Sequence, residues 1–266
     1  MRKIILFILS LVISMGVYSQ TRQPDVFLAK QLTYFEDMTL DEYVESGWDN
    51  SFSNIIEEKR YTATAALLDQ VELVYLERSG QISEKLTKNP EMQLITRVVY
   101  LYNNKGLLET EAIRDRKNRQ VSTSVYAYDD RGFQIERTLR GQNDRFLART
   151  FYTNDSRGRM IKSETKDPSG NPISHTEYTY DSQGNLTEQR VFNSEGVLTS
   201  IIRSEWQNGR ETKNVMLDAN GRQQLVVTKT YGQNGELLEE VVQNIQGDSK
   251  QVLKYEYTVR TAGRRS

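Results

Sequence analysis

Cysteine is absent from this chain of 266 residues, and histidine occurs only once. The missing cysteine excludes disulfides, thiolate catalysis and lipid attachment through a processed N-terminal cysteine. The one histidine, His175, follows a proline turn at the start of an expected strand, so we predict an exposed polar residue. The sequence also lacks a metal-ligand cluster and a Gly-rich phosphate loop. We therefore expect no enzymatic activity, no catalytic residue, no metal and no cofactor.

An excess of charge of one sign is also missing, since 35 Lys and Arg residues face 36 Asp and Glu residues. Without a global field we expect no nucleic-acid partner, and the basic residues near turns are diluted by acids. The aspartates near turns lack the multi-oxygen loop that calcium prefers, so we expect them to cap their turns instead. Those considered as a calcium ladder are Asp129, Asp130, Asp155 and Asp181.

Long apolar runs are confined to the N-terminus, where Arg2 and Lys3 precede an apolar run from Ile4 to about Val17. This pattern predicts a signal peptide over residues 1–19, cleaved near Ser19 and Gln20, because the run is short for a bilayer span. An uncleaved anchor is the alternative. We expect an extracytoplasmic protein, periplasmic, secreted or at the cell surface, whose mature chain does not insert into a membrane.

Proline is scarce, with four residues against 15 tyrosines, and this composition favours β-structure. A repeat organises it, because turn glycines recur in steps of 26, 26, 26, 26, 25 and 26 residues. These glycines are Gly80, Gly106, Gly132, Gly158, Gly184, Gly209 and Gly235. A second turn follows each by about twelve residues, at Asn118, Asp144, Gly170, Gly196, Gly221 and Gly247. Both turns resemble type I turns with a G1 bulge, so each repeat is predicted to be one β-hairpin.

The expected register pairs apolar residues across each hairpin. The predicted pairs are Tyr180 with Leu186, Tyr102 with Leu108, Tyr231 with Leu237 and Leu76 with Ile82, and the weaker ones are Tyr128 with Gln134 and Asn154 with Met160. Down the sheet these positions form one column, and a second column lies two residues earlier on the same face. The second column reads Val74, Tyr100, Tyr126, Tyr152 and Tyr178.

The aromatic columns are the candidate ligand-binding face, because exposed tyrosines can stack on sugar rings or accept an extended partner. The candidate residues are Tyr100, Tyr126, Tyr152, Tyr178, Tyr102, Tyr128, Tyr180 and Trp206. The alternative is that these side chains are buried and fill the concave side of a curled sheet.

Residues 20–66 do not follow the period. Thr39-Leu40-Asp41-Glu42 resembles a capping box and Gly47 a C-terminal stop, so a short helix is predicted over about residues 40–46, and a second could span 26–35. We expect residues 20–66 to cap the first strand edge, or to offer an acidic docking patch. The hairpin repeats would then cover residues 67–258, and residues 259–266 would form a flexible basic tail.

The stretch Tyr178-Thr179-Tyr180-Asp181-Ser182-Gln183-Gly184-Asn185-Leu186-Thr187 resembles the YD repeat of the Rhs and teneurin-like wall proteins. Tyr126-Ala127-Tyr128-Asp129-Asp130-Arg131-Gly132 repeats it, with weaker copies over about residues 72–257. The resemblance implies spiralling β-sheets that form extracellular shells or binding surfaces. Here the period is longer and the copies are few, which argues against an enclosing shell. The array is also similar to small secreted repeat proteins of Gram-negative bacteria, and to MORN repeats in having one hairpin per unit.

The sequence thus predicts an all-β antiparallel meander of about seven hairpins, in an open, twisted or curled sheet with a short helical N-terminal cap. The predicted function is a non-enzymatic binding or scaffolding protein that holds a protein or glycan partner, with an edge-to-edge homodimer as a possible assembly. One alternative is a sugar-processing or other hydrolase, which would need paired carboxylates about 5 to 10 Å apart on the concave face. Another is an outer-membrane barrel, against which the charged strand residues Glu188, Arg190, Glu211 and Lys213 argue.

Overall fold

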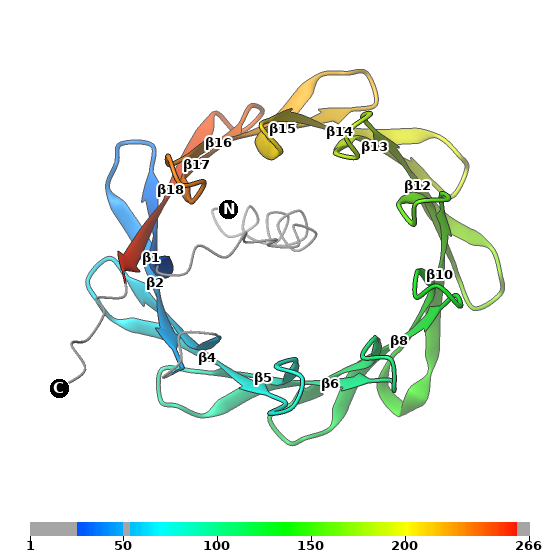
Figure 1. The fold of residues 1–266 in the computed structure, drawn as a ribbon, viewed down its shortest axis with the longest axis horizontal. Helices are drawn as coiled ribbons and strands as arrows, with labels where there is room; N and C mark the ends of the chain where they lie inside the picture. The colour runs from blue at the N-terminus through cyan, green and yellow to red at the C-terminus, as the bar shows by residue number, and fades with distance from the viewer. Residues whose placement is uncertain (1–25, 50–53, 260–266) are drawn as a thin grey trace.

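The computed structural model describes residues 26–49 and 54–259 and folds them into one antiparallel β-sheet. Each strand pairs with the strands before and after it, and the last strand pairs with the first, so the sheet closes into an 18-stranded barrel. Figure 1 shows the strands as a ring around an open centre. The strands are β1 (Val26–Phe35), β2 (Leu40–Trp48), β3 (Ile55–Thr62), β4 (Leu67–Tyr75), β5 (Ile82–Lys88), β6 (Leu94–Tyr102), β7 (Leu108–Asp115), β8 (Gln120–Tyr128), β9 (Gln134–Arg140), β10 (Phe146–Asn154), β11 (Met160–Lys166), β12 (Pro172–Tyr180), β13 (Leu186–Asn193), β14 (Leu198–Gln207), β15 (Arg210–Asp218), β16 (Gln223–Tyr231), β17 (Leu237–Asn244) and β18 (Ser249–Val259). A single 3-10 turn, Gln142–Asp144, joins β9 to β10.

The predicted open sheet with a helical cap is therefore wrong. The segments expected to be helical are β1 and β2, and together with β3 they supply the strands that complete the circle. The pairing of β1 with β18 also occupies the two edges that an edge-to-edge homodimer would have used. The predicted signal peptide and the basic tail lie outside the described residues, apart from residue 259 at the end of β18.

The capping-box pattern at residues 39–42 was misleading because its residues serve a turn and a ladder. The backbone N–H of Thr39 donates to the Asp37 carboxylate at 3.0 Å in the β1–β2 turn. After the turn, the rings of Tyr43 and Tyr61 stack at 5.0 Å across β2 and β3. Cross-strand packing of this kind outweighs a weak local helix signal.

The turns after odd-numbered strands form one rim of the barrel, which we call the second rim. The second-rim turns of the first three hairpins gave no signal in the sequence because they lack glycine. Their left-handed position holds Met38, Ala65 and Met92, with φ of 62°, 63° and 61°. Later turns place asparagine, aspartate or glycine there, although in the β17–β18 turn it is Asp248 and not the predicted Gly247 that has positive φ. The described strands form nine hairpins, two more than predicted.

We expect glycine at Met38, Ala65 and Met92 to stabilise the barrel, because a non-glycine residue in the left-handed region is strained by about 1 kcal/mol. Each substitution should raise the free energy of unfolding by about 0.5 to 1 kcal/mol, and denaturant unfolding of the triple variant measures the sum. Ala66, at the next position, does not have a positive φ, so Ala66→Gly should not stabilise the barrel. A triple variant no more stable than the native chain would show that this strain is absent.

The predicted register is confirmed in most hairpins. Tyr180 pairs with Leu186, Tyr102 with Leu108, Tyr231 with Leu237, Tyr128 with Gln134 and Asn154 with Met160. The pair of Leu76 with Ile82 is wrong, since Tyr75 faces Ile82. The spacing from Tyr75 to Tyr102 is one residue longer than the usual repeat, so Leu73 and not Val74 begins the second column.

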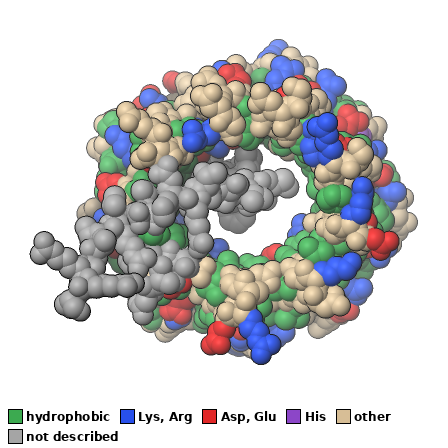
Figure 2. Space-filling view, in the orientation of Figure 1, with side chains coloured by type: hydrophobic (Ala, Val, Ile, Leu, Met, Phe, Trp, Pro, Cys, Tyr) green, Lys and Arg blue, Asp and Glu red, His purple; other side chains and the backbone are tan. Residues whose placement is uncertain are grey.

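The two faces of the closed sheet differ in character. In Figure 2 hydrophobic side chains, a class that includes tyrosine, are visible around the central opening, and charged side chains are spread over the ring. We assign the aromatic columns to this inner face, because side chains converge on the concave side of a barrel and spread apart on the convex side. Residues of the opposite face are accordingly open, with Leu101 55% and Phe151 38% exposed.

Nine side chains on the inner face form a closed ring of hydrogen bonds. Each donates to the backbone carbonyl of the residue 20 positions earlier, at 2.7 to 2.9 Å. The donors are Trp48, Tyr75, Tyr102, Tyr128, Asn154, Tyr180, Trp206, Tyr231 and Tyr257. Each acceptor is the cross-strand partner of the previous donor, and the circle closes because Leu28, which accepts from Trp48, pairs with Tyr257. We call these nine residues the hydrogen-bond ring.

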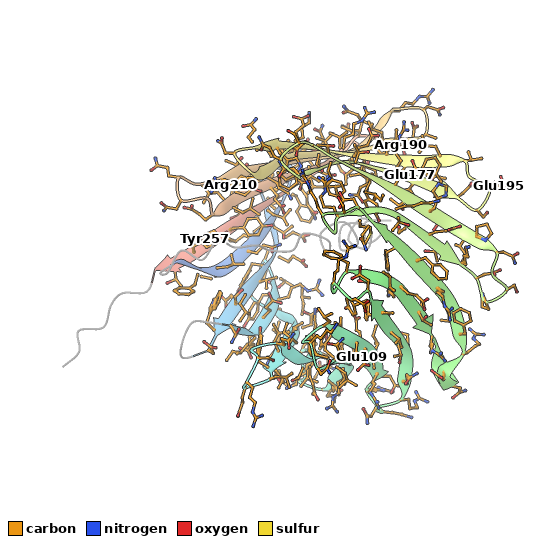
Figure 3. The ribbon with its side chains drawn as sticks, turned by 45° about the vertical axis from the view of Figure 1, so that its right-hand side comes forward. Glu109, Glu177, Arg190, Glu195, Arg210 and Tyr257 are labelled. Atoms are coloured by element: carbon orange, nitrogen blue, oxygen red, sulfur yellow. The ribbon has the colours of Figure 1, made fainter. Side chains whose placement is uncertain are left out.

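The turns after even-numbered strands form the first rim, next to the hydrogen-bond ring. In Figure 3 the label of Glu195 marks the second rim, in the turn before β14, and the label of Arg210 marks the first rim, just after the turn that follows β14. The two rims thus lie at opposite ends of this strand. Along the first rim the residue after a turn glycine often reaches the glycine of the next turn. Gln81 donates to the Gly106 carbonyl at 2.7 Å, and the ring of Phe133 lies against Gly158. Neighbouring hairpins are thus interlocked at their tips.

Candidate functional site: the inner wall of the barrel

The eight predicted site residues occupy two adjacent levels of the inner wall. Tyr102, Tyr128, Tyr180 and Trp206 belong to the hydrogen-bond ring, and their O–H or N–H groups are already donated to the backbone. They therefore have a structural role. The other four lie two residues deeper in even-numbered strands β6 to β12, and we call them the tyrosine belt: Tyr100, Tyr126, Tyr152 and Tyr178.

The four tyrosines of the belt are half-buried on the inner wall. The Tyr126 hydroxyl reaches the Glu111 carboxylate at 3.1 Å, and the Tyr178 hydroxyl lies 3.2 Å from Ser163 Oγ. Both partners lie 15 residues earlier, on the preceding strand, so each ring leans across that strand along the wall. Belt residues occupy alternate strands and so stand about 9.5 Å apart, twice the interstrand spacing. The result is a row of flat, half-buried aromatic surfaces.

Burial also alters the acidity of these phenols. Desolvation raises the pKa of Tyr100 and of Tyr126 to about 12, and the charge of Glu111 adds to the effect in both. Desolvation likewise raises the pKa of Tyr152. The neutral phenol is therefore the form that the inner wall holds.

We expect the barrel to lose stability between pH 10 and about pH 12 through Tyr100 and Tyr126. Their pKa in the folded chain, about 12, lies above the ordinary value of 10.0, so the unfolded state releases protons first as the pH rises. Their contribution is complete below pH 10 and is lost as the pH approaches 12. Ultraviolet absorbance of tyrosinate in the native protein should show these phenols ionising late, and ionisation of all tyrosines near pH 10 would contradict the burial described.

Charged residues alternate with the tyrosine belt on the intervening strands. Lys85, Glu111 and Arg137 take the inner positions of β5, β7 and β9, opposite belt residues or Leu73. Glu111 receives the hydroxyl of Tyr126. Arg137 donates from Nε and Nη2 to the hydroxyl of Ser124, at 3.1 and 2.9 Å. Among the described residues no carboxylate forms an ion pair with Arg137.

The other half of the wall carries a self-contained polar cluster, defined by Glu211, Lys229, Glu240 and Tyr255. Lys229 Nζ lies 2.7 Å from Glu211 and 3.6 Å from Glu240, and the Tyr255 hydroxyl donates to Glu240 at 2.6 Å. Burial opposes the charge on Lys229, but the bond and charge of Glu211 outweigh it and raise its pKa. For Glu211 burial is likewise outweighed, by hydrogen bonds from Lys229 and Ser204, so its pKa is lowered.

Sequence reasoning missed this cluster although its signal was present. Lys229 and Tyr255 lie two residues before Tyr231 and Tyr257 of the hydrogen-bond ring, which is the position of the tyrosine belt in other repeats. Extending the second column to β16 and β18 would have placed both on the inner wall.

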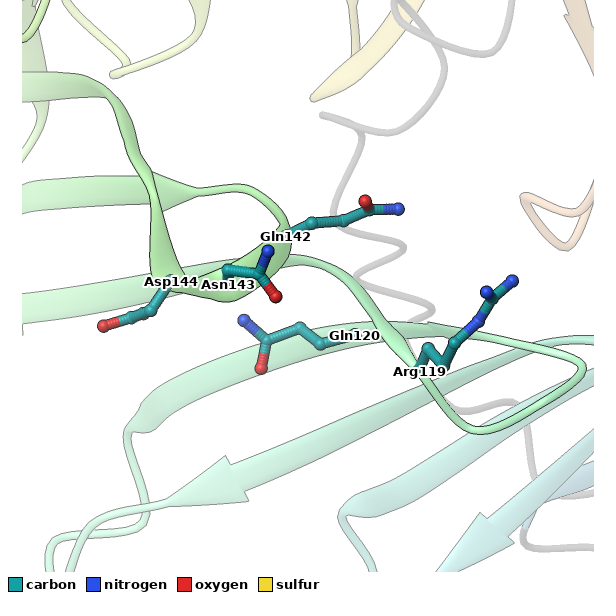
Figure 4. Close-up of a pocket in the computed structure, with 5 residues that line it drawn as sticks. All are labelled: Arg119, Gln120, Gln142, Asn143 and Asp144. Carbon is teal, nitrogen blue, oxygen red and sulfur yellow. The ribbon is translucent and has the colours of Figure 1, made fainter.

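Two depressions lie outside the inner-wall levels described above. Figure 4 shows the larger, about 590 Å³, between the turns that precede β8 and β10, lined by polar side chains. Its lining residues are Arg119, Gln120, Gln142, Asn143 and Asp144. The smaller, about 190 Å³, lies beside Phe151 and Lys166. Both are open to solvent.

The outer face carries ion pairs between neighbouring charged side chains. Arg97 pairs with Glu84, and Glu188 contacts Arg190 and Arg203 at 3.1 and 2.8 Å. In Figure 3 the cross-strand neighbours Glu177 and Arg190 are a further charged pair of positions on this face. None of the described residues forms a helix that is long and apolar enough to span a membrane. Within the same residues no group of three His, Asp or Glu is arranged to hold a metal ion.

No protein-family model and no curated protein sequence matches the chain. Among solved structures it is similar to the toxin assembly TcdB2-TccC3, with 15% identity and a TM-score of 0.35 over 85% of this chain and 16% of that chain. It is also similar to a porin-like protein from Bacteroides uniformis, with 11% identity, a TM-score of 0.32, and coverage of 88% and 96%. A third likeness, to a eukaryotic initiation factor, has 8% identity, a TM-score of 0.41, and coverage of 90% and 100%. The chain thus spans about one sixth of the toxin chain's length, and likenesses this weak carry no functional meaning.

Proposed function

We propose that this protein is a non-enzymatic, extracytoplasmic binding protein that holds an extended glycan chain on the inner wall of its barrel. The tyrosine belt carries the proposal, because it is a row of aromatic faces on one concave surface. Sugar rings present patches of C–H groups that pack on such faces, while hydroxyls bond to polar neighbours. Glu111, Arg137 and Ser163 supply those neighbours between the rings.

A glycan fits the belt better than a folded protein partner does. Tyr100 to Tyr178 span four alternate strands at about 9.5 Å intervals, which is close to the repeat of every second sugar in an extended β-1,4-linked chain. A folded protein would have to enter the lumen, whereas a single extended chain can lie along the wall.

One feature of the inner wall matches the hydrolase alternative, and one opposes it. Glu211 and Glu240 contact the same ammonium group at 2.7 and 3.6 Å, so their oxygens lie no more than about 6.3 Å apart, which is close enough for the two carboxyl groups to act on one bond. However, such an enzyme needs one carboxyl held protonated as general acid. Lys229 stabilises the ionised form and lowers the pKa of Glu211, which opposes that role.

We expect Tyr152→Ala to weaken binding of glycan oligomers by about thirtyfold, or about 2 kcal/mol, as loss of a central aromatic anchor does. Isothermal titration with neutral and acidic hexasaccharides measures the dissociation constant. Tyr152→Phe keeps the ring and should bind like the native protein. Phe151→Ala removes the neighbouring aromatic ring on the outer face, 38% exposed, and serves as the matched control.

The same titration extends to alanine at Tyr126 and Tyr178, with the melting temperature recorded for each variant. If the variants fold and bind as the native protein does, the belt is not the binding surface. If no glycan of the set binds the native protein, the proposed function is wrong.

A further inference from the structure

We infer that the tyrosine belt selects carboxylate-bearing glycans, such as chains of uronic acids, through Arg137. This inference rests on the proposed function and names the chemical class of its ligand. It starts from the position of Arg137 on β9, where its cross-strand partner on β8 is Tyr126 and the next belt ring along the wall is Tyr152 on β10. Arg137 therefore lies on the inner wall between two strands that each carry a belt tyrosine.

Arg137 has donors to spare. Guanidinium carries five N–H donors, and two of them, from Nε and Nη2, converge on the single oxygen of Ser124. Within the described residues Arg137 takes part in no ion pair, in contrast to Arg149 on the next strand, whose Nε lies 3.3 Å from Glu136. An arginine with unused donors on a concave wall is suited to bind a planar carboxylate.

The local balance of charge at this level favours an anion. Lys85 on β5 and Arg137 on β9 are cations at this inner level, and Glu111 on β7 is the only carboxylate at the same level between them in the described strands. Glu111 already accepts a hydrogen bond from Tyr126. A uronic acid stacked on Tyr126 or Tyr152 would bring its carboxylate within reach of the guanidinium, while its ring packs on the phenol face.

The experiment compares oligogalacturonate hexamers with their methyl esters, which keep the backbone and remove the charge. The native protein should bind the acid at least tenfold more tightly than the ester, and Arg137→Gln should abolish that difference by weakening binding of the acid more than binding of the ester. Arg137→Lys keeps a charge but not the planar pair of donors and should retain part of the preference. Arg149→Gln, on the outer face of β10, is the matched control and should bind both ligands as the native protein does.

The outcomes separate this inference from the proposed function. Equal binding of acid and ester, or an acid preference that survives Arg137→Gln, overturns the inference while the belt remains a glycan site. Hexamers of mannuronate and of hyaluronan, with their carboxyl-reduced forms, repeat the comparison on other backbones. Failure of every acidic and neutral oligomer to bind the native protein overturns both.

Discussion

Replacing Lys229 by methionine should lower the free energy of unfolding by about 3 kcal/mol, since it leaves two carboxylates on the inner wall without their shared cation. Glu240 is only 7% exposed, so water cannot readily replace the lost partner. Denaturant unfolding at neutral pH measures the effect. Because the pKa of Glu211 lies below its ordinary 4.5 in the native protein, its contribution is present above pH 4.5 and is lost as the pH falls.

Two further variants give this prediction its control and its rescue. Lys59→Met removes a lysine that pairs with Glu57 on the outer face, and exposed pairs of this kind contribute about 0 to 1 kcal/mol. Adding Glu211→Gln and Glu240→Gln to Lys229→Met removes the stranded charges and should recover much of the loss. Equal effects of Lys229→Met and Lys59→Met would contradict the burial of the cluster.

Gly158→Ala should lower the free energy of unfolding by about 3 kcal/mol, the second large effect. Backbone strain contributes about 1 to 2 kcal/mol of this loss. Steric overlap, like overpacking in a core, contributes about 1 to 3 kcal/mol. Its φ of +82° is strained for alanine, and a Cβ would lie 2.7 Å from Cδ1 of Phe133 and closer still to two other ring atoms. Thermal or denaturant unfolding would measure the sum.

Gly170 is the matched control for Gly158. It has φ of +87°, but a Cβ there would meet nothing within 4 Å, so Gly170→Ala should show only the backbone cost. In a Phe133→Ala background, Gly158→Ala should fall to the same cost, because the overlapping ring is gone. If Gly158→Ala and Gly170→Ala are equally destabilising in the native background, the first-rim turns are not interlocked.

Much of the hairpin register could be predicted because turn chemistry and cross-strand pairs repeat. The regular spacing of the turn glycines and the pairs Tyr180–Leu186 and Tyr102–Leu108 are legible in the sequence and hold in the structure. Where one repeat is longer than the others by a single residue, counting back from Tyr102 gives Leu76, although Tyr75 takes the position. A fixed period cannot detect one extra residue inside a turn.

Closure of the sheet could not be predicted in the same way, because it depends on strands whose turns lack the glycine that marks the later hairpins. Met38 and Ala65 occupy positions where the later repeats carry glycine or asparagine, and a capping-box pattern imitated a helix in β2. The signal that remained was Trp48, which lies one repeat before Tyr75 and completes the hydrogen-bond ring. Counting aromatic residues rather than glycines would have found the missing hairpins.

The candidate site was likewise only half visible. Alternation placed the tyrosines on one face, but a sequence cannot say which tyrosine hydroxyls are committed to backbone carbonyls. That distinction separates Tyr128, in the hydrogen-bond ring, from Tyr126, in the tyrosine belt. The proposed role of Arg137 depends on its having no ion-pair partner among the described residues. That feature follows from the folded barrel and cannot be predicted from the sequence.

The inner wall exists only if β1 pairs with β18, so a cross-link between these strands tests the account most directly. Leu32 and Lys254 are paired residues, and paired positions on antiparallel strands stand about 4.5 to 5.5 Å apart at Cα, within disulfide range. The chain has no other cysteine to interfere. A Leu32→Cys, Lys254→Cys variant should form an intramolecular disulfide in the folded monomer under mild oxidation. Free thiols in the folded protein, or bonds formed only between molecules, would contradict the closed barrel.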